Sequence, residues 1–183
     1  MNERFRIASV ADAKALVEIY RPYVEQTAIT FEYEVPSVEE FASRIEQTLE
    51  RYPYIVVEDE KQQILGYAYA GTYKGRSAYD WSVEVTVYLH QDYKGKNLGR
   101  RLYEELERYL QAQNVLQLTA CITAGNGASE HFHEKMGYKQ VALFEKIGYK
   151  FNQWYDVCWM QKTLAQLPEK PVAFIPFNQL KMS

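Results

Sequence analysis

Two adjacent segments carry the side chains best suited to chemistry, and the first is the run "SVEVTVYL" at 82–89. Its strict alternation predicts a strand with one apolar and one polar face. The apolar face would hold Val83, Val85, Val87 and Leu89, and the polar face Glu84, Thr86 and Tyr88. A carboxylate in a partly enclosed cleft can have a raised pKa and relay a proton through water. Glu84 is therefore a candidate general base, although the pattern alone favours a surface carboxylate on an ordinary strand.

The second segment is the basic, glycine-containing run "YKGKNLGRR" at 93–101, which leads into a predicted helix. Helix N-termini expose unpaired N–H groups and bind anions. The amides from about Gly95 to Arg100 would form such a site, with lysine and arginine side chains adding charge. Asn97 is the kind of residue that tolerates a left-handed conformation. A solvated turn is the alternative, and neither the Walker pattern nor the dinucleotide fingerprint is present.

Metal and thiol chemistry are not favoured. His131 and His133 are two positions apart on a predicted helix and would not share a face, and no third ligand is evident. Cys121 and Cys158 each lie in an apolar, strand-like run, so we expect buried, reduced thiols. The sequence therefore predicts no metal site and no covalent cysteine nucleophile.

The elements that would position these residues form a mixed sheet flanked by helices, an α/β (or α+β) fold. Strands are expected at 5–8, 54–58, 64–73, 82–89, 115–122, 138–148 and 155–164. Helices are expected from about residue 13, from 38 after the capping box "SVEE", from 98, and briefly after 127. We expect one domain over 1–165 and a proline-spaced tail over 166–183 that lies extended on the surface or frays.

Composition limits the class of protein. The 183 residues suit one domain with its own core, and the net charge of −3 gives no electrostatic case for a nucleic-acid partner. No apolar run reaches the roughly 20 residues of a membrane helix, and the N-terminus lacks a secretory apolar region. We therefore expect a soluble, cytoplasmic protein without a membrane partner.

The strand–"KGKNLG"–helix junction and the later "GNGASEHFHEKMGY", in this order of elements, resemble the GNAT superfamily of acetyl-CoA-dependent N-acetyltransferases. The resemblance implies a fourth strand that splays from the fifth, acetyl-CoA as cofactor, and a direct attack by an amine with Glu84 as base. The family loop that holds the pyrophosphate maps onto 94–99, with Lys94 for the usual Arg or Gln and Asn97 for the central Gly. The implied cofactor residues are Val85, Thr86, Val87, Lys94, Gly95, Lys96, Asn97, Leu98, Gly99, Arg100, Asn126 and Ser129.

Three longer runs, "GRSAYDWSVEVTVYL", "GNGAS…HEKMGY" and "GYKFNQWYDVCWMQ", look like the phosphinothricin and methionine sulfoximine N-acetyltransferase branch over roughly residues 4–165. The branch implies a small amino-acid-like amine as substrate, a homodimer, and His133 as a catalytic partner, with a solvated helix histidine as the alternative. Tyr88 is expected near the acceptor, as a further catalytic residue. The implied substrate-binding residues are Phe31, Arg76, Tyr79, Lys150 and Trp154. For Arg76 and Lys150 the alternative is a solvated loop charge, and for the aromatic residues a place in the core.

Two other functions remain open at this point. The chain could acetylate protein or peptide amines, as other GNAT branches do, or it could be a non-catalytic module that binds acyl-CoA. The loop "KGRSAYDW" and the run "GYKF…W" favour the small substrate because they would close the acceptor groove.

Overall fold

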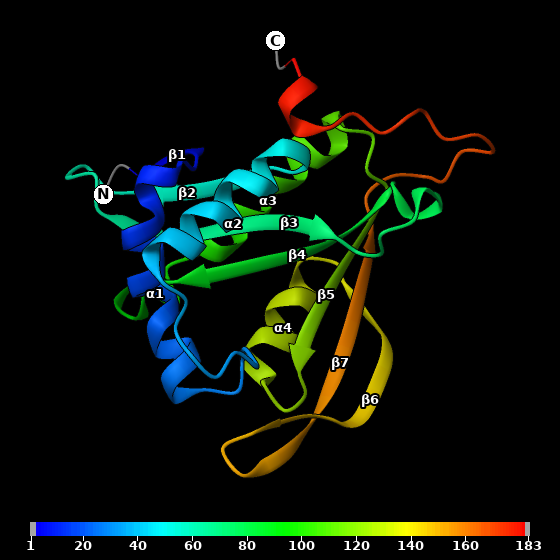
Figure 1. Cartoon of the computed structure of the whole chain (residues 1–183). Helices are drawn as coiled ribbons and strands as arrows, with labels where there is room; N and C mark the ends of the chain where they lie inside the picture. Colours follow the sequence, from blue (N-terminus) through cyan, green and yellow to red (C-terminus); the bar gives the residue numbers. More distant parts are fainter. Residues whose placement is uncertain (1–2, 182–183) are drawn as a thin grey trace.

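A seven-stranded sheet in the order β1-β2-β3-β4-β5-β7-β6 forms the centre of the computed structural model, which describes residues 3–181 (Figure 1). Every neighbouring pair is antiparallel except β4 and β5, which are parallel. The predicted α/β fold with a mixed, mostly antiparallel sheet is therefore confirmed. The strands are β1 (Arg4–Ile7), β2 (Tyr54–Glu58), β3 (Ile64–Thr72), β4 (Ser82–Leu89), β5 (Gln117–Thr123), β6 (Lys139–Lys150) and β7 (Gln153–Thr163).

Helices cover both faces of the sheet (Figure 1). They are α1 (Ala13–Gln26), α2 (Val38–Arg51), α3 (Leu98–Ala112) and α4 (Gly127–Lys135). One buried cluster joins α1 and α2 to the face of β2 and β3 that carries Tyr54 and Tyr67. A second cluster joins the apolar stripe of α3 to the opposite face, including Val83 and Val85 of β4. The expected cap of α2 is present, since the Ser37 hydroxyl accepts the N–H of Glu40 at 3.1 Å.

The alternation of β4 has the consequence expected from the sequence. Val83 and Val85 are buried against α3, whereas Glu84, Thr86 and Tyr88 face the other side. Pairing between β4 and β5 stops at Glu84↔Thr119, and beyond this pair the two strands diverge (Figure 1). In a ladder about half of a strand's backbone groups face each neighbour, so β4 presents unpaired groups to this opening. The splayed fourth strand is thus confirmed.

The last two strands form one long hairpin that reaches further than predicted. They extend to Lys150 and begin again at Gln153, with Phe151 and Asn152 between them at φ of 48° and 61°. Two consecutive residues with positive φ make a two-residue hairpin turn of the favoured hand. Large apolar side chains are exposed along this hairpin, namely Val141, Leu143, Phe144, Ile147, Tyr149, Phe151 and Trp154.

Of the two alternatives expected for the tail, an extended course on the surface holds for 172–175 and fraying does not. The indole N–H of Trp81 donates to the carbonyl of Val172 at 2.7 Å, and the side chain of Asn114 donates to the carbonyl of Ala173 at 2.8 Å. The backbone carbonyl of Gln113 accepts the N–H of Ile175 at 3.1 Å, and the side-chain Nε2 of Gln113 donates to the carbonyl of Ile175 at 2.8 Å. These bonds hold the tail against the end of α3, because its backbone groups find partners there.

Candidate active site

Glu84 lies at the last paired position before β4 and β5 separate. Its side chain is half-buried, and burial raises the pKa of its carboxyl group, which the positive charge of Lys74 lowers in part. Desolvation disfavours the carboxylate, so such a group is a better proton acceptor than an exposed one. Glu84 lines a cavity of about 370 Å³, so it combines the access and the basicity that a general base requires.

The cavity that contains Glu84 is called the transfer cavity below. It is lined by β4, β5, the connection between α1 and α2, and α4. It brings together nine residues that the sequence assigned to the site. They are Phe31, Glu84, Val85, Thr86, Val87, Tyr88, Asn126, Ser129 and His133. The unpaired backbone of β4 thus borders the same space as the carboxylate.

A second cavity of about 460 Å³ adjoins the first and contains the basic loop. The two share Ile29, Val87, Asn126 and Ser129, so a path leads from the loop to Glu84. Of the predicted cofactor loop, Lys94, Gly95, Asn97, Leu98, Gly99 and Arg100 line this second, or cofactor, cavity. Lys96 does not line it, because its ammonium lies over the ring of Tyr93 at 4.3 Å.

The loop has the geometry of an anion cradle at the start of α3. Asn97 is the N-cap residue and has the left-handed conformation (φ 63°, ψ 9°) that the sequence suggested it could adopt. Gly95 also has a positive φ of 76°, which disfavours any side chain. The ammonium of Lys94 lies 4.7 Å from the ring of Tyr23 at the cofactor cavity, whereas Arg100 forms an ion pair with Glu104 at 2.8 Å. The exposed amides and Lys94 suit a pyrophosphate.

His133 is buried rather than solvated, so that alternative is excluded. Its Nδ1 is 2.8 Å from the carbonyl of Ser129, which can only accept, so Nδ1 carries the proton. Nε2 then accepts the hydroxyl proton of Tyr103 at 3.1 Å. Burial lowers the pKa of His133, so the imidazole is kept neutral and oriented.

Tyr103 and Cys121 line the transfer cavity and were not assigned to the site from the sequence. Tyr103 is a buried residue of α3 and has the features of an ordinary core residue. Only its hydrogen bond with His133 indicates that it belongs to the site. The expectation that Cys121 is buried is wrong, since its side chain is exposed on β5, while Cys158 is buried. Desolvation and the charge of Glu84 raise the pKa of the Cys121 thiol to about 11, which keeps it protonated and a poor nucleophile.

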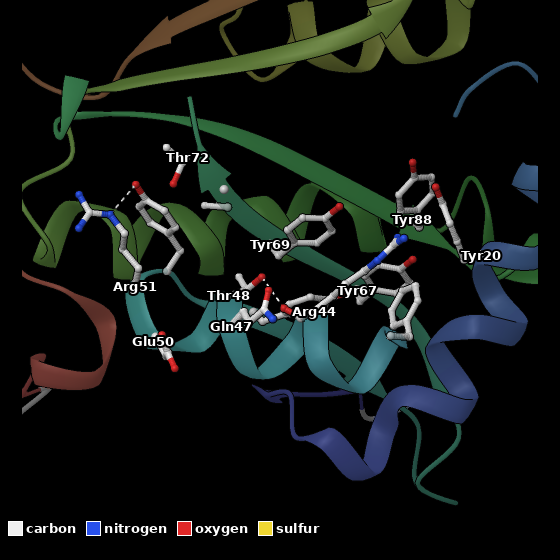
Figure 2. Close-up of a pocket in the computed structure, with 15 residues that line it drawn as sticks. Tyr20, Arg44, Gln47, Thr48, Glu50, Arg51, Tyr67, Tyr69, Thr72 and Tyr88 are labelled. Atoms are coloured by element: carbon white, nitrogen blue, oxygen red, sulfur yellow. Dashed lines mark hydrogen bonds between the residues drawn. The ribbon is translucent and has the colours of Figure 1, made fainter. Parts of the chain in front are cut away.

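A third cavity, of about 450 Å³, lies between α2 and the sheet face that carries Tyr69 and Tyr88 (Figure 2). It shares Tyr20, Arg44, Tyr69 and Tyr88 with the transfer cavity. Arg44 extends from α2 toward Tyr20 and Tyr88 in Figure 2, and it forms ion pairs with Glu32, at 2.6 Å, and with Glu40. The sheet face that carries Glu84 is therefore rich in tyrosine, and Arg44, the cation that lines both cavities, is neutralised by two carboxylates.

Four predicted substrate residues do not line the cavity with Glu84. Arg76 and Tyr79 are exposed on the loop between β3 and β4, and Trp154 is 60% exposed near the hairpin tip. Lys150 departs from the expectation of a free cation, because its ammonium is buried and donates to three backbone carbonyl groups. The roles of Arg76, Tyr79 and Trp154 stay predictions.

Comparison with known proteins identifies the class. Residues 5–159 match the family model described as "Acetyltransferase (GNAT) domain", and the chain belongs to this family. It is an acetyl-CoA-dependent N-acetyltransferase, as the sequence resemblance predicted. Among the described residues no group of three or more His, Cys, Asp or Glu is arranged to hold a metal, and no helix there is long and apolar enough to cross a membrane.

The relatives place the chain in the branch recognised from the sequence. It is 35% identical to a phosphinothricin N-acetyltransferase of Streptomyces viridochromogenes, over 96% of this chain and 94% of that protein. It is 32% identical to an L-methionine sulfoximine/L-methionine sulfone acetyltransferase of Pseudomonas aeruginosa, over 90% of this chain and 96% of that one. The structure of a phosphinothricin acetyltransferase from Sinorhizobium meliloti in complex with acetyl-CoA superposes with a TM-score of 0.90 at 32% identity, covering 100% of both chains.

Proposed function

We propose that this acetyltransferase acts on the amino group of a small amino-acid-like substrate, of the phosphinothricin or methionine sulfoximine/sulfone type, and that Glu84 is its general base. The observation that carries the proposal is the position of Glu84. It is half-buried, has a raised pKa, and stands where β4 and β5 part, between the cofactor cavity and the tyrosine-lined acceptor side.

Each step has a residue suited to it. Acetyl-CoA supplies the thioester when bound. Glu84 accepts a proton from the ammonium of the acceptor, directly or through one water. The unpaired N–H groups of β4 beyond Glu84 stabilise the negative charge that develops on the carbonyl oxygen. The proton that the attacking nitrogen loses as the amide forms passes through water to the departing sulfur. The hydroxyl of Tyr103 lines the same cavity and donates its own proton to Nε2 of His133, so its oxygen is suited to hold that water.

Two observations support an amino-acid acceptor. The named relatives act on phosphinothricin, methionine sulfoximine or methionine sulfone, and a further one from Escherichia coli, 32% identical, is an L-amino acid N-acyltransferase. In addition, the positive charge of Lys74 lowers the pKa of Glu84, and a second cation, Arg76, follows two residues later on the same loop. We propose that this loop supplies cations for the acceptor's carboxylate, since charge-assisted hydrogen bonds of this kind give specificity.

Acetylation of a protein amine is the second candidate. A structure described as a ribosomal-protein-alanine N-acetyltransferase from Brucella melitensis superposes with a TM-score of 0.84 at 32% identity, covering 87% of this chain and 99% of that one. It favours a peptide acceptor for the same cavity.

We also propose a homodimer that forms through the β6–β7 hairpin. The exposed apolar side chains of this hairpin include Phe144 at 46%, Ile147 at 58% and Trp154 at 60% exposure. Large apolar side chains exposed along one hairpin are typical of an interaction site, and a second copy of the chain would cover them. Sedimentation equilibrium would test this, with a monomer at micromolar concentration as the contradicting result.

The experiment that tests the function is a comparison of acceptors. Release of free thiol from acetyl-CoA is followed with methionine sulfone, with a peptide bearing an N-terminal alanine, and without acceptor. We expect turnover with methionine sulfone well above the other two. Faster turnover with the peptide would favour the protein acceptor, and binding of acetyl-CoA without turnover of any amine would favour the non-catalytic module.

A further inference from the structure

Residues 27–33, the first part of the connection between α1 and α2, form one wall of the transfer cavity and are called the acceptor loop below. Four consecutive residues of it, Ile29 to Glu32, line that cavity, and only Ile29 also lines the cofactor cavity. The loop has no regular secondary structure, so its position depends on contacts with other segments. Three consecutive residues of β6, 148–150, supply such contacts.

Lys150 makes the most extensive of them. Its side chain is only 4% exposed, and its ammonium donates to the carbonyl groups of Val24 at 2.7 Å, Thr27 at 2.8 Å and Thr30 at 2.9 Å. These are carbonyls at the C-terminal end of α1 and in the acceptor loop, where backbone acceptors lack helical partners and the helix dipole is negative. All three donors of the ammonium are thus used within the chain.

Gly148 and Tyr149 hold the same loop from the adjacent positions. A Cβ on Gly148 would lie 2.2, 2.4 and 2.8 Å from three ring atoms of Phe31, so the aromatic ring rests directly on the backbone of β6. The carbonyl of Tyr149 accepts the hydroxyl of Tyr33 at 2.6 Å. A contact this close leaves room for glycine alone at 148 unless the ring of Phe31 moves.

We propose that residues 148–150 of β6 are positioning residues that clamp the acceptor loop and thereby set acceptor affinity. The proposal rests on the proposed function, because it assigns the clamp to the acceptor side of the same site. A wall held by a buried ammonium and a seated ring is preorganised, and loosening it misplaces Phe31 relative to Glu84. The cofactor cavity, which shares only Ile29 with the loop, keeps its geometry.

Two variants test the clamp, each with a control. Lys150→Met leaves three carbonyls without a donor, and Lys139→Met makes the same change at the exposed start of β6. Gly148→Ala pushes on the ring of Phe31, and its control is the same substitution in a Phe31→Ala background, where the space is free. We expect Lys150→Met and Gly148→Ala to lower acceptor kcat/KM about 10–100-fold, mainly through KM, with the Kd for acetyl-CoA unchanged.

The control variants give the contrasting results. Lys139→Met should behave as wild type, and adding Gly148→Ala to Phe31→Ala should change kcat/KM less than about twofold, since the two residues act through one contact. The clamp proposal would be overturned if adding Gly148→Ala to Phe31→Ala lowered acceptor kcat/KM as much as Gly148→Ala does in the wild-type background. It would also be overturned if Lys150→Met had the wild-type KM for the acceptor. If Lys150→Met does not fold, the comparison of Gly148→Ala in the wild-type and Phe31→Ala backgrounds tests the clamp by itself.

Hydrogen exchange separates this proposal from the proposed function. In Lys150→Met, amides 27–33 should exchange faster than in wild type, while those of α3 should be unchanged. This hydrogen-exchange measurement does not require turnover. If wild-type enzyme fails to acetylate amino acids, the proposed function fails, yet faster exchange in the loop still supports the clamp. Equal exchange in Lys150→Met and wild type would contradict it.

Discussion

Replacing Glu84 by Gln removes the proposed base while preserving the shape and hydrogen-bonding reach of the side chain. A positioned general base contributes about 10²–10⁴-fold to a rate, which is about 2.7–5.4 kcal/mol of transition-state stabilisation. We expect a loss in kcat within this range at neutral pH. Acetyl-CoA affinity should be unchanged, because Glu84 does not line the cofactor cavity that holds the loop.

The pH dependence gives a sharper form of this prediction. Burial raises the pKa of Glu84 above its usual 4.5, and only the carboxylate can accept a proton. In wild type, kcat/KM should therefore fall as pH decreases through this raised pKa. Lys74 lowers the pKa of Glu84, so Lys74→Met should move this fall to higher pH. In Glu84→Gln, the decrease in kcat/KM at low pH that titration of Glu84 causes should vanish. The loss of rate relative to wild type should become smaller at high pH, where the amine loses its proton without a base.

The assay is thiol release at saturating acetyl-CoA over a pH series, with calorimetric titration of acetyl-CoA into each variant. Cys121→Ser is the matched control, because this thiol lines the same cavity and stays protonated. It should retain kcat within about threefold, a change of under 1 kcal/mol. An unchanged kcat in Glu84→Gln at neutral pH, or an unchanged acid limb, would refute the reasoning.

Three further predictions concern the cofactor, the leaving group and the acceptor. Gly95→Ala strains a positive φ by about 1–2 kcal/mol and should raise the acetyl-CoA Kd about 5–30-fold in calorimetry. Gly137→Ala, at another positive φ outside the cavities, should lower Tm without changing that Kd. Tyr103→Phe leaves Nε2 of His133 without its donor and should lower kcat about tenfold or more while acetyl-CoA still binds; an unchanged kcat would remove the pair from the mechanism. Arg76→Ala should reduce the preference for an acceptor with an α-carboxylate over its plain amine, itself about 10–100-fold in kcat/KM, because a charge-assisted hydrogen bond contributes roughly 1.5–3 kcal/mol. A preference that survives intact in Arg76→Ala would exclude that residue from carboxylate binding.

The parts of the site that depend on local sequence could be predicted. The alternation of β4 gave the side on which Glu84 lies, because side chains on a strand alternate. The left-handed conformation of Asn97 also follows from residue type, since Asn tolerates positive φ better than most other side chains. These features need no knowledge of distant contacts.

The parts that failed depend on contacts between segments far apart in the chain. Lys150 looked like a solvated or substrate-binding charge, but its partners lie 120–126 positions earlier. Cys121 looked buried because its run is apolar, yet the separation of β4 from β5 exposes it. The tail pairs with Trp81 and Gln113 through carbonyl groups that no sequence pattern marks. Such pairings are set by tertiary packing rather than by propensity.

The most direct test is a crystal structure with a bisubstrate analogue, in which coenzyme A is joined through an acetyl linker to the nitrogen of methionine sulfone. Its pyrophosphate should lie on the amides of 95–100, and its linker should cross the opening between β4 and β5. Its nitrogen should be within hydrogen-bond reach of Glu84, directly or through one water. A nitrogen remote from Glu84, with the acceptor outside the cavity lined by Phe31 and Tyr88, would contradict the account.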